Sequence, residues 1–423
     1  MDNFLGIDIG TSGIRANIID ARGNLLARTG TAIPPSRTVN GLYTQQPEDW
    51  WAGILRCIDL LAGMHSLKDI RGIAIDGTSG TTLLTDRDNL PLSPALMYND
   101  IRPAEVIETV KQLAPDIPAC SRTSALARAI WLFRNHRPKG YVFVQQQADW
   151  ILSRFTAKSV ASDWNNALKL GFDVHTLSWP DWLGTVLPAK AQLPVVYKPG
   201  EPVARISASV AKATGLPPTA VMHAGTTDSI AAFLASGARQ PGEAVTSLGT
   251  TLVLKLCTQN PVVSNQHGIY SHRLDTGRWL AGGASNSGGS VLKAKFSDSE
   301  LAELSTQMDP DHDTGLDYYP LPAPGERFPI ADPGFPPKIK PVPADRAMFL
   351  QGLFEGIARI EKQGYDLLEK LGADPVSSIR SAGGGANNPG FTRIRQRIVK
   401  RPLIGADNTD AAYGSALLAA GRV

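Results

Sequence analysis

The stretch FLGIDIGTSG, residues 4–13, decides how the rest of this chain is interpreted. It joins a short apolar strand to a tight Gly-Thr-Ser corner, and a second apolar strand, 14–19, follows directly. Glycine lets such a corner tighten, so that its N–H groups and the flanking hydroxyls gather on one anion. The pattern therefore predicts a hairpin that cradles phosphate.

The same pattern returns in the second half of the chain as AVTSLGTT, residues 244–251, followed by an apolar strand over 252–256. Gly249 follows Gly10 by 239 residues, a spacing too long for a solenoid repeat and suited to two related lobes. We expect the two hairpins to hold a polyphosphate. The second copy carries Ser247 where the first carries Asp8.

Composition indicates a soluble, two-domain, cytoplasmic enzyme. A chain of 423 residues is long enough for at least two domains. No apolar run approaches the roughly 20 residues of a membrane span, and no secretory signal pattern opens the chain. Three scattered cysteines form neither a metal pair nor an even disulfide set, which favours a reducing compartment. The net charge of +3, without basic runs, argues against nucleic acid and membranes as partners.

Strands and helices alternate along the chain in the manner of α/β lobes. Strands are expected at 70–76, 221–224 and 378–380, and helices at 50–61, 230–238, 349–371 and 389–399. The break Gln-Pro-Gly at 240–242 places the boundary between a first lobe, 1–239, and a second lobe, 240–423. The Pro-rich stretch 310–343 predicts an ordered surface loop.

Two aspartates are the candidate catalytic residues. Asp228 follows a strand in the turn GTTDS, 225–229, where it can take the proton of a substrate hydroxyl as general base; the alternative is a cap for the next helix. Asp8 lies on an apolar strand, where a carboxylate is costly unless it is paired. At a phosphate hairpin it suits Mg²⁺, usually through water, and the alternative is an Asp bonded to local N–H groups.

Two Gly-rich runs, 282–289 and 381–388, are the candidate nucleotide site, or else ordinary strand-to-helix turns. Gly384 and Gly385 would let adenine approach the backbone at a helix N-terminus, while Asn388 bonds the base and Phe391 stacks on it. Gly288, in the earlier run, would contact ribose or phosphate. The chain contains no GxxxxGK[ST] loop and no strict GxGxxG after a strand, which disfavours P-loop and Rossmann folds.

Taken in order, the motifs resemble those of the FGGY carbohydrate kinases, and they span nearly the whole chain. They are GIDIGTS (6–12) with Arg15, QPEDWW (46–51), GTTD (225–228), GERFP (325–329), LFEG (353–356) and GGGANN (383–388). Each motif is weak alone, whereas the ordered set is specific. The chain looks most like a short, xylulokinase-like branch whose members act on D-ribulose.

This resemblance implies an α/β, two-lobed actin/hexokinase-like (ribonuclease H-like) ATPase fold with an interlobe cleft. The first lobe would bind sugar and the second the nucleotide. Asp228 would act as general base, and Asp8 would position the metal, the γ-phosphate and a sugar hydroxyl. The β- and γ-phosphates would lie against Thr11, Ser12 and Gly13, with Gly249 and Thr250 closing from the other lobe. Arg15 would neutralise transition-state charge or form an ion pair.

Sugar recognition rests on two further candidates. Ser79, in the turn after strand 70–76, would hydrogen-bond a sugar hydroxyl. Asp100 lies in LMYNDIR, 96–102, which resembles the family's Trp-x-Asp-x-Arg element with Tyr98 in place of Trp; the alternative is an ion pair with Arg102.

The resulting hypothesis is an ATP- and Mg²⁺-dependent kinase, a monomer or homodimer, that converts D-ribulose to D-ribulose 5-phosphate. D-Xylulose is the first alternative substrate, and glycerol or another polyol the next. A non-kinase actin-like ATPase or a sugar sensor is the alternative of another class.

Overall fold

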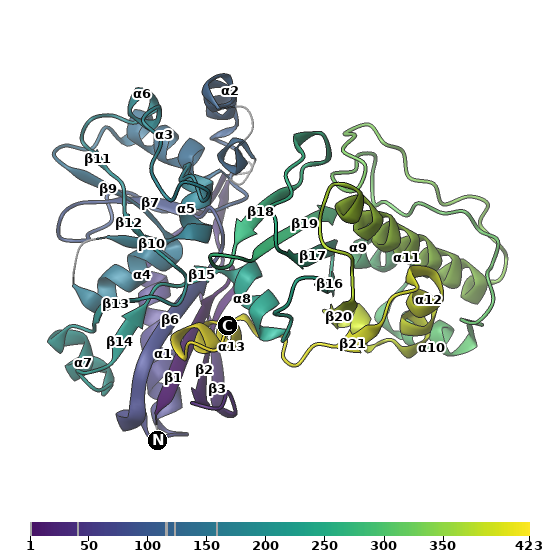
Figure 1. Cartoon of the computed structure of the whole chain (residues 1–423), viewed down its shortest axis with the longest axis horizontal. Helices are drawn as coiled ribbons and strands as arrows, with labels where there is room; N and C mark the ends of the chain where they lie inside the picture. The colour runs from purple at the N-terminus through teal and green to yellow at the C-terminus, as the bar shows by residue number, and fades with distance from the viewer. Residues whose placement is uncertain (1, 40–41, 115–116, 122–123, 158–159) are drawn as a thin grey trace. The chain divides into compact units, whose positions relative to one another are not determined.

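The computed structural model describes residues 2–39, 42–114, 117–121, 124–157 and 160–423 (Figure 1). The chain forms two compact units, one of residues 1–235 with 410–423 and one of residues 236–409. Among the described residues no helix is both long and apolar enough to span a membrane.

A mixed sheet forms the centre of the first unit, in the order β13-β14-β6-β1-β2-β3, and β15 also pairs with β6. Strands β1, β2 and β3 are antiparallel neighbours, while β6 runs parallel to β1, and β14 parallel to β6. The bounds are β1 Asn3–Ile9, β2 Gly13–Asp20, β3 Leu25–Ala32, β6 Ile70–Gly77, β13 Pro202–Arg205, β14 Val221–His223 and β15 Thr226–Thr227. The strands predicted for the first hairpin and for 70–76 are confirmed.

Alternation along β1 explains how its two faces are used. Leu5, Ile7 and Ile9 join one hydrophobic core with Ile54 of helix α1 (Pro47–Ala62). Gly6 faces helix α13 (Ala411–Ala419) so closely that a Cβ there would lie 1.9 Å from the Ala412 carbonyl oxygen.

The C-terminal helix therefore belongs to the first unit, whereas the sequence-based boundary assigned it to the second lobe. Its small residues let its backbone approach both β1 and helix α8 (Asp228–Ala235), and Figure 1 shows the yellow helix beside purple β1. Gly414 is one contact point, since a Cβ would lie 1.9 Å from the Ala231 oxygen. Helix α8 ends earlier than the predicted Ala238, because Gly237 adopts φ +87°.

A second sheet of the first unit has the order β11-β9-β7-β8-β5-β4, and a small ladder joins β10 to β12. The bounds are β4 Arg37–Val39, β5 Leu42–Gln45, β7 Thr82–Thr85, β8 Ala95–Leu96, β9 Val142–Gln146, β10 Ala161–Asp163, β11 Ala191–Gln192 and β12 Val195–Tyr197. The accompanying helices are α2 Ala104–Leu113, α3 Ala125–His136, α4 Gln147–Thr156, α5 Trp164–Leu170, α6 Leu183–Val186 and α7 Ala208–Thr214.

The sheet of the second unit repeats the plan of the first, in the order β18-β19-β17-β16-β20-β21. Strands β16, β17 and β19 are antiparallel neighbours, and β20 and β21 continue in parallel from β16. The bounds are β16 Glu243–Leu248, β17 Leu252–Thr258, β18 Tyr270–Arg273, β19 Trp279–Ser285, β20 Ser378–Ala382 and β21 Leu403–Gly405. The order β19-β17-β16-β20-β21 corresponds to β3-β2-β1-β6-β14, so the expectation of two related lobes is confirmed.

Helices α9 (Gly289–Lys293), α10 (Asp298–Gln307), α11 (Arg346–Lys370) and α12 (Pro389–Val399) complete this unit. Helix α11 starts earlier than predicted because the Asp345 carboxylate accepts the N–H groups of Ala347 and Met348. The stretch 310–343 contains neither helix nor strand, as expected for a loop. It still buries Tyr318 and Phe328 in the core of the unit.

Candidate active site

Asp8 lies on β1 with a carboxylate on one side and a cation on the other. Its neighbour across the parallel ladder is Asp76 of β6, and its antiparallel partner is Arg15 of β2. The Arg15 Nη1 donates to Asp8 Oδ2 over 3.1 Å, and Asp8 is only 3% exposed. The pairing that a buried carboxylate requires is thus present, and Arg15 forms the ion pair that the sequence left as one of two alternatives.

Asp76 is fully buried and was not singled out from the sequence. The Ser415 hydroxyl of α13 donates to its Oδ2 over 2.6 Å, while its Oδ1 has no hydrogen-bond partner. Burial and the neighbouring charge of Asp8 raise the pKa of Asp76 well above its usual value, and burial raises the pKa of Asp8. Two adjacent carboxyl groups therefore compete to ionise.

The acid pair fits the chemistry of Mg²⁺. This cation takes oxygen ligands, uses one or two carboxylates, and completes its shell with water and phosphate oxygens. Asp8 and the partnerless Oδ1 of Asp76 supply such oxygens. In the part of the chain that the structure describes, no three His, Cys, Asp or Glu side chains group as a metal site. The arrangement suits an ion that brings phosphate oxygens as further ligands.

The turn after β1 is held from its flank. Gly10 N–H donates to the Gly13 carbonyl over 2.9 Å, and Gln45 Nε2 donates to the Thr11 carbonyl over 2.8 Å. Trp50 Nε1 in turn donates to Gln45 Oε1 over 2.9 Å, which gives the QPEDWW motif a structural role. Ser12 at the tip is exposed, and Thr11 and Gly13 are half-buried. The turn that was predicted to meet phosphate is therefore formed and accessible.

Asp228 begins α8 directly after β15 and is half-buried. Its Oδ1 accepts the N–H of Ser229 over 2.6 Å, so the contact with the helix N-terminus that the alternative predicted is present. Because Thr227 pairs with Gly77 in the parallel ladder, Asp228 follows β15 at the edge where β6 ends. Its charge contributes to the raised pKa of Asp76. The structure thus brings Asp8, Asp76 and Asp228 to one edge of one sheet.

The two predicted sugar contacts have different surroundings. Ser79 follows β6 at this same edge, and its hydroxyl is buried without a partner. Asp100 instead accepts the Tyr43 N–H over 2.7 Å and three hydrogen bonds from Arg102, and its side chain is 0% exposed. These contacts favour the ion-pair alternative for Asp100.

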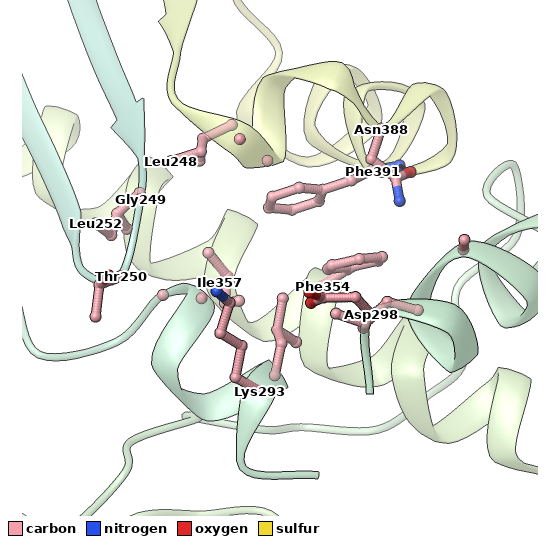
Figure 2. Close-up of a pocket in the computed structure, with 17 residues that line it drawn as sticks. Leu248, Gly249, Thr250, Leu252, Lys293, Asp298, Phe354, Ile357, Asn388 and Phe391 are labelled. Atoms are coloured by element: carbon pink, nitrogen blue, oxygen red, sulfur yellow. Dashed lines mark hydrogen bonds between the residues drawn. The ribbon is translucent and has the colours of Figure 1, made fainter. Parts of the chain in front are cut away.

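A cavity of about 440 Å³ lies in the second unit (Figure 2). Its lining includes every nucleotide-binding residue that was predicted in this unit, namely Gly249, Thr250, Gly288, Gly384, Gly385, Asn388 and Phe391. The predicted residues Thr11, Ser12 and Gly13 belong to the first unit.

Glycines let the turns at 249–250 and 288–289 approach each other closely in the lining of the cavity. Gly289 N–H donates to the Gly249 carbonyl, and Ser290 N–H to the Thr250 carbonyl, over 2.9 and 3.0 Å. Gly288 has φ +131°, and a Cβ there would lie 2.8 Å from the carbonyl carbon of Thr251. By contrast, a Cβ on Gly384 would meet nothing within 4 Å, so that position opens onto free space.

One end of the cavity is aromatic. The rings of Phe391 and Phe354 stack with centroids 4.4 Å apart and planes 14° apart, as Figure 2 shows. Asn388 lies beside them, but its Oδ1 accepts the Phe391 N–H and its Nδ2 donates to Ser305 Oγ. Asn388 therefore caps α12, and its amide already has partners on both sides.

Several residues of the candidate site were not predicted from the sequence. Lys293 and Asp298 carry the charged groups of the lining, and Phe354 supplies the stacked ring from the LFEG motif. Glu326 of the GERFP motif is 3% exposed and accepts the Ser285 hydroxyl and the Asn286 N–H, so it positions the turn before Gly288. Asp76 is a carboxylate on an apolar strand, and the argument applied to Asp8 would have found it.

Comparison with known proteins identifies the family of the chain. Residues 3–235 match the FGGY family of carbohydrate kinases, N-terminal domain, and residues 244–422 match the C-terminal domain of that family. A xylulose kinase of Escherichia coli (strain K12) is 26% identical over 408 residues, which cover 91% of this chain and 82% of that protein.

Solved structures share the fold of the whole chain. A ligand-bound xylulose kinase from Lactobacillus acidophilus gives a TM-score of 0.86 at 17% identity, covering 99% of this chain and 89% of the other. Plasmodium falciparum glycerol kinase with ADP also gives 0.86, at 18% identity, covering 100% and 90%. The fold is therefore the two-lobed, actin/hexokinase-like one that was predicted.

Proposed function

Because this chain belongs to the FGGY family of carbohydrate kinases, we propose that it transfers the γ-phosphate of ATP to a ketopentose. D-Ribulose, giving D-ribulose 5-phosphate, is the first choice and D-xylulose the alternative. The similarity to the E. coli xylulose kinase supports a ketopentose. The order of the two sugars rests on the resemblance to the short D-ribulose-kinase branch.

The observation that carries the proposal is the common edge of β6 and β15. It presents the carboxylate of Asp228 beside the turn that holds the buried, partnerless hydroxyl of Ser79. A carboxylate next to such a hydroxyl suits a polyhydroxylated substrate, since sites built on hydrogen bonds discriminate among hydroxyl groups far better than apolar pockets.

In the proposed reaction, Asp228 accepts the proton of the attacking sugar hydroxyl. Asp8, held by the hydrogen bond from Arg15, orients the groups that meet at the hairpin turn. Bound Mg²⁺ would neutralise charge on the phosphate oxygens. Phosphoryl transfer needs little covalent work from the protein, so positioning and electrostatics account for most of the catalysis.

The nucleotide would occupy the cavity of the second unit. Its apolar part, with Leu301, Ile357 and the stacked rings, suits the adenine base. The phosphates would lie towards Gly249 and Thr250, where backbone N–H groups and a hydroxyl are available. Lys293 supplies a positive charge in the same lining.

The test is ADP release with and without a panel of pentuloses and polyols, followed by identification of the phosphorylated product. We expect stimulation by D-ribulose above D-xylulose, and by both above glycerol. ADP release that no sugar stimulates would instead favour an ATPase or a sugar sensor. A higher kcat/KM for D-xylulose would reverse the order of the two ketopentoses.

A further inference from the structure

Three buried polar groups around the ends of β6 and β15 have no hydrogen-bond partner among the described residues. They are the hydroxyl of Ser79, Nε2 of Gln147 and Oδ1 of Asn165. The side chains of Gln147 and Asn165 are 0% exposed. Neither residue was a candidate at the sequence level, and neither has a role in the catalysis described above.

Gln147 begins α4 and is locked against the turn that follows β6. Its Oε1 accepts both the backbone N–H of Thr78, over 2.9 Å, and the Thr78 hydroxyl, over 2.8 Å. Since a backbone N–H only donates, the amide oxygen must face Thr78, which fixes the orientation of the group. Its NH₂ group is therefore a donor of fixed orientation. Thr78, which Gln147 contacts, is the residue directly before Ser79.

Asn165, in α5, approaches the same edge from the side of β15. Its Nδ2 donates to the Thr226 hydroxyl over 3.0 Å. Thr226 pairs with Asp76 in the parallel ladder and lies two residues before Asp228. A hydroxyl both donates and accepts, so either end of the amide can face Thr226, and in both cases the other end is left without a partner.

Such groups are costly in a fold. A buried polar atom that lacks a partner destabilises a protein by roughly 1–3 kcal/mol. Other such atoms occur among the described residues, for example Oε1 of Gln145, but the three around the ends of β6 and β15 lie at one edge of one sheet. Three at one edge, beside Asp228, are explained if a polar ligand supplies the missing partners. Their chemistry is directed, because Gln147 offers only a donor whereas Ser79 offers a donor and an acceptor.

We propose that Gln147 and Asn165 hydrogen-bond the sugar and set its specificity. The inference rests on the proposed function, because it assigns these residues to the substrate of that reaction. Gln147 Nε2 donates to a carbonyl or hydroxyl oxygen of the open-chain sugar, and the free end of the Asn165 amide bonds a second hydroxyl. Ser79 completes the set, while Asp228 takes the proton of the reacting hydroxyl.

The experiment compares steady-state kinetics of Gln147→Glu and Asn165→Leu with the wild type, using D-ribulose and D-xylulose. Gln147→Glu keeps an oxygen for Thr78 but turns the free donor into an acceptor. We expect the KM for the sugar to rise roughly tenfold or more, the range set by one unpaired buried group. The KM for ATP should stay within about twofold in the same variants, because the nucleotide lining lies elsewhere, in the second unit.

Gln145→Glu is the matched control. Gln145 is also 0% exposed and also has a partnerless atom, Oε1, but it lies in β9 of the second sheet, where its Nε2 donates to Thr85 Oγ1 and Asn89 Oδ1, each over 2.6 Å. The control makes the same isosteric change in charge, and its sugar KM should stay within about twofold of the wild type. Melting curves with and without D-ribulose, and a neutral Gln147→Met variant, separate a loss of sugar contacts from a loss of folding.

Unchanged sugar KM and unchanged sugar-dependent melting in folded Gln147 and Asn165 variants would overturn the inference and assign both amides to internal water. An equal rise of the sugar KM in the Gln145→Glu control would also overturn it. A wild-type protein that phosphorylates no sugar would instead refute the proposed function itself. The two failures are therefore distinguishable.

Discussion

The buried ion pair between Glu361 of α11 and Arg395 of α12 predicts a large and specific loss of stability. Arg395 Nε and Nη2 each donate to the Glu361 carboxylate over 2.7 Å, and both side chains are 0% exposed. Burial alone would lower the pKa of Arg395, but the Glu361 carboxylate outweighs burial and raises it. The perturbation is Arg395→Met, which leaves the carboxylate buried without its cation.

The magnitude follows from what remains around Glu361. Its Oε1 keeps the hydrogen bond from Thr246, at 2.6 Å, but both bonds from the guanidinium are lost. Breaking a buried pair from one side costs about 3–5 kcal/mol. For a unit the size of residues 236–409 each kcal/mol lowers Tm by about 2–4 °C, so we expect the transition of this unit to fall by roughly 6–20 °C. Replacing both partners by apolar residues should cost far less.

Differential scanning calorimetry and urea unfolding would measure this in the wild type, Arg395→Met, Glu361→Leu and the double variant. The unfolding of each unit must be followed separately, because a two-unit chain need not unfold in one step. The double variant should be more stable than Arg395→Met by about 2 kcal/mol or more. The reasoning is refuted if Arg395→Met costs under about 1 kcal/mol, or if the double variant is the less stable of the two.

Three further outcomes are expected. Asp228→Asn should lower sugar-dependent turnover by about 10²–10⁴-fold and change ATP affinity, measured by calorimetry, by less than about threefold; a folded variant that no longer binds ATP would remove Asp228 from the role of base. Burial raises the pKa of Asp163 from 3.8 to about 6, which means that the folded protein favours the protonated carboxyl group. The contribution of this group to stability is therefore complete below about pH 4 and is lost as the pH rises through 6. Asp163→Asn keeps an acceptor for the N–H groups of Asn165 and Asn166. The free energy of unfolding of this variant, measured with urea, should therefore rise relative to that of the wild type by up to about 3 kcal/mol between pH 4 and pH 7. A difference in unfolding free energy that does not vary with pH would contradict this. Gly384→Leu should fold normally, since a Cβ there meets nothing within 4 Å, yet raise the KM for ATP about tenfold or more by filling the cavity; Gly384→Ala, with an unchanged melting temperature, is its control.

Patterns confined to one element could be predicted from the sequence. The Gly-Thr corners at Gly10 and Gly249 mark both hairpins, and the glycines at 383–385 lead to the cavity, because turn-forming residues are recognisable within a short stretch of sequence. The role of α13 could not be predicted. Its segment AAYGSALLA has apolar and small residues all round, so nothing in its own pattern selects the sheet on which it packs.

The site shows the same division between local and long-range information. Asp8 and Asp228 stand out because a carboxylate on an apolar strand, or in a Gly-flanked turn, is locally unusual. The amide groups of Gln147 and Asn165 become notable only when Thr78 and Thr226 occupy one end of each and leave the other end without a partner. That information lies in contacts across 69 and 61 residues of sequence, which no local pattern contains.

The two copies of the repeated hairpin share a fold but differ in the charge of the residues beside the turn. Asp8 faces Asp76 across the parallel ladder of the first sheet, and the matching positions of the second sheet are Ser247 and Ala382. The first unit therefore concentrates negative charge at this point, whereas the second is neutral there. Carboxylates repel a triphosphate, so the neutral copy is the one suited to hold it directly. The acidic copy suits a cation and a hydroxyl that must lose its proton, which is why catalysis is assigned to the edge that carries Asp8 and Asp228.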